Sequence, residues 1–125
     1  MWKYPPAYSA LGHRYADGDG VERNDVKAVQ LWKKALIHDR DNEFSGEIAW
    51  NLSVYYAKGK GVPQNEVANY AYLLAAKALG YGTAKSYLQR NEQFFSEYTR
   101  ANGQRMAAQI WAEIEAGKSG KSDRK

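Results

Sequence analysis

Residues 15–21 read YADGDGV, and residues 56–62, 41 positions later, read YAKGKGV. The two heptapeptides differ only where two aspartates of the first are lysines in the second. The match continues outward at the same offset, pairing Leu11 with Leu52, Asn24 with Asn65, Trp32 with Leu73 and Ala35 with Ala76. Because each copy of such a repeat is one supersecondary unit, the repeat decides the architecture before any single element is assigned.

Helical periodicity flanks both glycine motifs. Apolar residues before each motif recur at i, i+3 and i+7, on one helix face, as Tyr8, Leu11 and Tyr15 and again as Ala49, Leu52 and Tyr56. Gly18 and Gly59 stand where a helix end commonly requires a left-handed residue. Asn24 and Asn65 are placed to cap the next helix, whose apolar stripe follows. Each unit is therefore predicted to be a helix hairpin.

These residues resemble the Sel-one-like repeat (SLR) family, an α-solenoid relative of tetratricopeptide repeats. Unit one supplies the family's pattern through Leu11-Gly12, Tyr15, Gly18, Gly20, Val21, Asn24, Lys27-Ala28, Trp32 and Lys34-Ala35. Unit two supplies it through Leu52, Tyr56, Gly59, Gly61, Val62, Asn65, Tyr72, Ala75-Ala76 and Gly80. There are two departures: Asn69 stands where unit one has Ala28, and the linker 39–46 is about five residues longer than the family's usual period of roughly 36 allows.

The resemblance weakens after Gly80, because no Gly-x-Gly-Val turn follows Tyr87 and Leu88. The helical pattern runs on, pauses at Asn102-Gly103 and resumes. We expect a C-terminal capping helix pair, since the last repeat of a solenoid would otherwise expose its stacking face. The predicted fold is all-α, a single domain over residues 1–117 with repeats at about 5–40 and 46–80 and a cap at 82–117, followed by a disordered basic tail, 118–125.

Composition and charge limit the classes of partner that the chain is expected to bind. The net charge of +4 resides mostly in residues 118–125, so residues 1–117 carry 14 basic and 13 acidic side chains, a poor match to a nucleic-acid surface. No apolar run is long enough for a membrane span, and the N-terminus lacks a secretory leader. We expect a soluble protein, monomeric when unbound, that is cytoplasmic as written and periplasmic if a leader was trimmed.

Candidate chemistry is sparse. With no cysteine, thiolate metal sites and a cysteine nucleophile are excluded. Asp17 and Asp19 alternate as in a calcium loop, but the sixth and twelfth positions from Asp17 are Glu22 and Ala28 instead of glycine and glutamate. His13 is expected on the surface of the first helix and His38 at the end of the second. The sequence predicts no catalytic residues, no metal site and no cofactor.

Aromatic residues outside the predicted stripes suggest a binding face. Most tyrosines and tryptophans fall on apolar repeat positions, but Trp50 and Tyr55 lie beside the stripe, on the flank where such repeats line a concave surface with their first helices. The predicted protein-binding groove comprises His13, Arg14, Trp50, Asn51, Val54, Tyr55, Tyr87 and Arg90. The alternative is that Trp50 packs under the 39–46 loop.

The resemblance implies non-catalytic recognition of a protein or peptide. Compact bacterial members of the family act as immunity proteins against toxins or as adaptors in signalling or envelope assembly. We expect the immunity role, on account of the stand-alone size and the lack of a catalytic constellation, with the adaptor as the alternative. A hydrolase using His13 or His38 and an RNA-binding module using the tail are the rivals from other classes.

Overall fold

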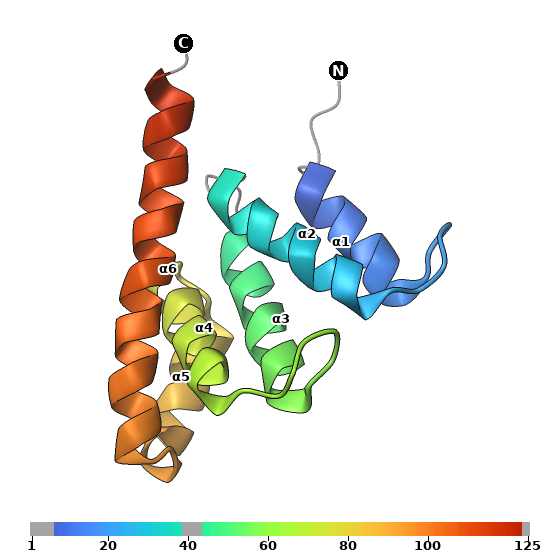
Figure 1. Ribbon diagram of the computed structural model, residues 1–125. Helices are drawn as coiled ribbons and strands as arrows, with labels where there is room; N and C mark the ends of the chain where they lie inside the picture. The colour runs from blue at the N-terminus through green and yellow to red at the C-terminus, as the bar shows by residue number, and fades with distance from the viewer. Residues whose placement is uncertain (1–6, 39–43, 124–125) are drawn as a thin grey trace.

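The computed structural model describes residues 7–38 and 44–123, which form α-helices and one short 3-10 helix and contain no strand. The elements are α1 (Ala7–Asp17), α2 (Asp25–His38), α3 (Ser45–Lys58), α4 (Glu66–Ala78), α5 (Gly82–Asn91), η1 (Glu92–Phe94) and α6 (Glu97–Asp123). α1 pairs with α2 and α3 with α4, so the predicted helix hairpins and the all-α fold are confirmed (Figure 1). The two hairpins stack through α2 and α3.

The two glycine turns have the same structure. Gly18 and Gly59 both adopt φ = 71°, and each has the backbone and Cβ of the residue five positions later within 3.7 Å of where its own Cβ would lie. The amide of Asp19 donates to the carbonyl oxygen of Arg14 at 2.9 Å, and 41 positions on Lys60 donates to Tyr55 at the same distance. The left-handed conformation therefore recurs because the glycines recur.

Both predicted N-caps are present. The Asn24 side chain accepts a hydrogen bond from the amide of Lys27, and the Asn65 side chain accepts one from the amide of Ala68, each at 3.0 Å. Each cap satisfies one of the free amides in the first turn of the hairpin's second helix. The sequence therefore fixes the start of α2 and of α4.

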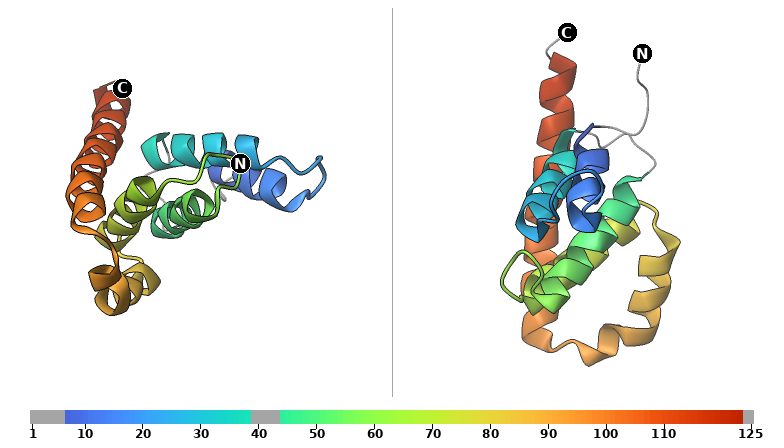
Figure 2. Two further views of the ribbon diagram at one scale, coloured as in Figure 1. Left: turned by 60° about the horizontal axis from the view of Figure 1, so that its bottom comes forward. Right: turned by 90° about the vertical axis from the view of Figure 1, so that its right-hand side faces the viewer.

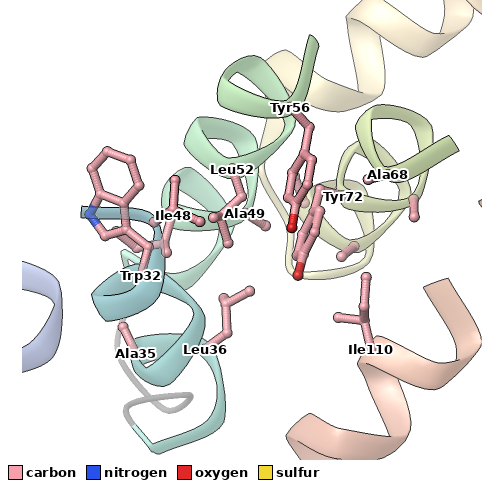
Figure 3. Packing of buried hydrophobic residues seen from close by; sticks show 14 of the residues in the cluster. Trp32, Ala35, Leu36, Ile48, Ala49, Leu52, Tyr56, Ala68, Tyr72 and Ile110 are labelled. Atoms are coloured by element: carbon pink, nitrogen blue, oxygen red, sulfur yellow. The ribbon is translucent and has the colours of Figure 1, made fainter. Parts of the chain in front are cut away.

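The core lies between the two hairpins and continues under α6. Trp32 and Leu36 of α2 pack toward Ile48 and Leu52 of α3, and Tyr56 stacks on Tyr72 of α4 (Figure 3). Leu11, an expected core position, keeps 40% of its surface exposed, whereas its counterpart Leu52 is fully buried. Leu52 packs in the core between the two hairpins, whereas α1, which carries Leu11, packs on α2 within the described residues.

The helical segment after repeat two is interrupted at a different place from the predicted one. α5 ends at Asn91, the chain turns through η1, and α6 begins at Glu97 (Figure 2). At the start of α6 the Ser96 hydroxyl accepts a hydrogen bond from the amide of Thr99 at 3.1 Å. The predicted pause at Asn102-Gly103 is wrong, because both residues lie inside α6. Gly103 allows α6 to pack closely on α4, because a Cβ there would lie 2.5 Å from the Tyr70 ring of α4.

α6 is longer than the predicted cap. It continues to Asp123, through the first six residues of the segment expected to be a disordered tail. Across residues 7–38 and 44–123 no helix combines the length and apolarity needed to cross a bilayer.

Candidate protein-binding face

The eight residues of the predicted groove lie on the first helix of each unit. His13 and Arg14 belong to α1, Trp50, Asn51, Val54 and Tyr55 to α3, and Tyr87 and Arg90 to α5. The two arginines are exposed and the other six side chains are half-buried. The structure gathers the aromatic members into two groups joined by α3.

The first aromatic group surrounds Trp32. The ring of Tyr55 meets the indole edge-on at a centroid distance of 5.0 Å, and the ring of His13 meets it at 5.5 Å. Gly12 allows this arrangement, because a Cβ there would lie 2.6 Å from the indole. The buried tryptophan thus positions two groove residues that come from different hairpins.

Tyr55 also has a polar environment. The ammonium group of Lys60 lies 4.5 Å from the centre of its ring. Burial raises the pKa of its hydroxyl, and the negative charge of Asp25 raises it further. The hydroxyl therefore stays protonated at neutral pH and can donate a hydrogen bond.

The second aromatic group surrounds Trp50. Its indole lies 5.8 Å from the ring of Tyr81 and 5.9 Å from the ring of Tyr87, which it meets edge-on. Trp50 and Tyr87, both of the predicted groove, are therefore in contact. Trp50 joins repeat two to α5. The predicted alternative places Trp50 under the 39–46 loop, of which residues 39–43 lie outside the described part of the chain.

An aromatic extension of this face was missed by the sequence analysis. Phe94 in η1 is 75% exposed and Tyr98 in α6 is 71% exposed. Phe94 borders a pocket of about 180 Å³ that Tyr87 also lines, together with Glu66, Asn69, Asn91 and Phe95. The sequence offers only a weak signal, the adjacent pair Phe94-Phe95, of which one member is buried and the other exposed.

The groups considered for catalysis or metal binding lie apart from each other. His13 contacts Trp32, while His38 is the last residue of α2 and lies 5.6 Å from the ring of Tyr8. Asp17 and Asp19 are exposed on the first turn. Within the described residues, no three histidine, aspartate or glutamate side chains converge on a possible metal position.

Comparison with known families gives a match to a repeat family. The family model described as "Sel1 repeat" matches residues 5–36 and 47–81, which correspond to the hairpins α1–α2 and α3–α4. No curated protein matches the chain. The matched ranges contain both glycine turns and both asparagine caps, and they end before α5.

Proposed function

This chain belongs to the Sel1 repeat family, whose members are generally protein–protein interaction modules, and we propose that it binds a protein or peptide through its aromatic face. We define the aromatic face as His13, Arg14, Trp50, Asn51, Val54, Tyr55, Tyr87, Arg90 and Phe94. The repeats are typically non-catalytic, and the proposal requires recognition alone.

The observation that carries the proposal is the exposed Phe94 beside Tyr87. A large aromatic side chain that is three-quarters exposed contributes little to the fold, yet it offers much apolar area to a partner. It borders a pocket that a partner's side chain can fill. The Trp50 ring meets the Tyr87 ring edge-on, so the Tyr87 ring is held in place before binding.

Charge indicates the kind of partner. Arg14 at one end of the aromatic face and Arg90 at the other are both exposed, and guanidinium groups form bidentate pairs with carboxylates. We therefore propose a partner surface with apolar side chains flanked by aspartate or glutamate.

The more specific role that we propose is that of an immunity protein whose partner is a bacterial toxin. Immunity of this kind needs only a tight complex that covers a surface of the toxin. The adaptor role predicts a partner that is not toxic.

The test is affinity capture from lysate of the source cells with the wild-type protein and with Phe94→Ala, followed by binding measurements on the purified partner. Phe94→Ala should weaken binding about 30-fold, as for a hot-spot aromatic. Gln93→Ala, an exposed neighbour in the same 3-10 turn, is the matched control and should bind like the wild type. Both variants should unfold at the wild-type temperature.

Expression of the purified partner in a host cell separates the two roles. An immunity protein restores growth that the partner abolishes, and Phe94→Ala reduces this protection. Equal binding by Phe94→Ala and wild type would contradict the aromatic face, and a harmless partner would contradict the immunity role.

A further inference from the structure

A cavity on the opposite side of the repeats is built by α6. This helix approaches α4 at Gly103 and α2 at Gly117, where an added Cβ would lie 2.5 Å from the Tyr70 ring and 2.5 Å from the Ile37 side chain. Between the two glycines α6 bridges the gap between α2 and α4 (Figure 1). A cavity of about 290 Å³ remains beneath the bridge.

One part of the cavity wall is apolar. Leu36 and Ile37 contribute from α2, and Met106, Ile110 and Ile114 contribute from α6. An apolar cavity of about 150 Å³ is large enough to take benzene. The volume here therefore suits an aromatic ring or a branched chain together with a short polar end.

The other part of the wall includes Tyr72. Tyr72 lines the cavity and is 5% exposed, and its ring stacks on Tyr56 at 5.6 Å with 10° between the planes. Figure 3 shows both hydroxyls directed to the same side, between Leu36 and Ile110. Neither hydroxyl forms a hydrogen bond with any residue of the described part of the chain. Among the described residues the fully buried side-chain atoms without a partner are Asp25 Oδ1 and Trp32 Nε1, so the Tyr72 hydroxyl keeps accessible surface and can donate a hydrogen bond to a ligand in the cavity.

Two opposite charges also line the cavity. Lys33 of α2 places its ammonium group 5.2 Å from the centre of the Tyr56 ring. Burial raises the pKa of the Tyr72 hydroxyl, and the charges of Tyr56 and of Glu113 of α6 raise it further. Neither Lys33 nor Glu113 forms an ion pair within residues 7–38 and 44–123. The charged lining therefore sums to zero, and it presents a cation and an anion that form no ion pair with the described residues.

We propose that this cavity binds a small zwitterion with an apolar body, of which a free aromatic or branched-chain amino acid is the simplest. The ligand's carboxylate pairs with Lys33 and its ammonium group with Glu113. Its apolar side chain lies against Leu36, Ile110 and Ile114. This site is separate from the aromatic face, since it is formed by the second helices of the repeats and by α6.

The test is a titration of the full chain, with isoleucine methyl groups labelled for NMR, against L-phenylalanine. The signals of Ile110 and Ile114 should shift and saturate with a Kd of about 1 mM or lower. Phenylacetate lacks the ammonium group and phenethylamine lacks the carboxylate, so each should bind about tenfold more weakly. N-acetyl-phenylalanine amide, which mimics a side chain within a peptide, should bind as weakly as these or not at all.

Single substitutions test which side chain binds each charged group of the ligand. Lys33→Gln and Glu113→Gln should each weaken L-phenylalanine about tenfold, and Lys33→Gln should leave phenethylamine unaffected. Tyr72→Phe should weaken binding without loss of stability, because its hydroxyl forms no hydrogen bond with the described residues. Lys34→Gln, an exposed neighbour of Lys33, is the control and should bind normally.

Two results would overturn the proposal. The absence of a saturable shift with L-phenylalanine would remove the site. Equal affinity for L-phenylalanine and N-acetyl-phenylalanine amide would show that the cavity takes an apolar side chain of a peptide, with no role for the two charges.

Discussion

The two repeats have the same local structure and different surroundings. Their turns share φ angles, hydrogen bonds and caps. A Cβ added at Gly61 would collide with the backbone of Asp25 and Val26, whereas a Cβ added at Gly20 would lie 3.8 Å from the end of the Arg14 side chain. The turn is therefore dictated locally by glycine. What the turn contacts is dictated by the position of the hairpin in the stack.

The stacking positions show the same difference in composition. Position 55 is a tyrosine that contacts Trp32 of the preceding hairpin, whereas the equivalent position 14 is an arginine exposed to solvent. Ile48 is buried and its equivalent is Ala7. Repeat one therefore carries less apolar residues at these two positions than repeat two does.

The largest expected effect is the difference in stability loss between alanine variants of Leu52 and Leu11. Leu52→Ala should lower the free energy of unfolding by about 2 to 5 kcal/mol, because it leaves a cavity between the hairpins. Leu11→Ala should cost about 1 kcal/mol, since the side chain is already partly in water. Urea denaturation of both variants provides the measurement. Equal losses would mean that the two positions are equally buried.

The next effect separates the second glycines of the turns. Gly61→Ala should cost about 2 to 5 kcal/mol, because the alanine is held at φ = 72° and its Cβ collides with the Asp25 carbonyl group. Gly20→Ala has the same conformational cost without the collision and should lose about 1 to 2 kcal/mol. Thermal unfolding of the pair compares them directly. A greater loss at Gly20 would contradict the stacking described above.

A third difference appears at equivalent positions 29 and 70. Val29 and Tyr70 are both buried, but the Tyr70 hydroxyl donates a hydrogen bond to the Glu92 carboxylate, which ties repeat two to η1. Burial, and then this hydrogen bond, raise the pKa of Tyr70 to about 12 from 10.0. Folding therefore favours the neutral phenol, so its stabilising contribution is complete below pH 10 and is lost as the pH rises to about 12.

Tyr70→Phe tests that linkage. At neutral pH the variant should lose about 1.5 to 3 kcal/mol, the usual contribution of a hydrogen bond to a charged group. Between pH 10 and about 12 the wild type should lose stability more steeply than the variant, by at most about 1.4 kcal/mol per pH unit. Denaturation curves across this range measure both slopes. Parallel slopes would mean that Tyr70 does not titrate differently on folding.

The sequence predicted the parts of the fold that depend on neighbouring residues. Both turns, both caps and both hairpins were predicted because glycine and asparagine act within a few positions of where they stand. Gly103 was misassigned, since a glycine that ends a helix and a glycine that admits a tyrosine ring look alike in one dimension. The cap diverges from the repeat, so its geometry had no internal template.

The residues of the candidate sites also differ in whether the sequence could predict them. Trp50 and Tyr87 were predicted for one face because the repeat assigns the faces of the first helices, and the structure places the two rings in contact. Phe94 was missed because its exposure depends on how η1 leaves α5. The cavity could not be predicted, since Lys33, Tyr72 and Glu113 are distant in sequence and meet only when α6 crosses the repeats.

The smallest effect tests what the repeats share. Asn24→Ala and Asn65→Ala should each cost about 1 kcal/mol, because both side chains accept the same hydrogen bond at 3.0 Å. Paired denaturation curves should therefore coincide, unlike those of the leucine and glycine pairs. A larger loss at Asn65 would show that α4 depends on its cap through the contact with α6, and the local equivalence of the two repeats would then fail even where their structures agree.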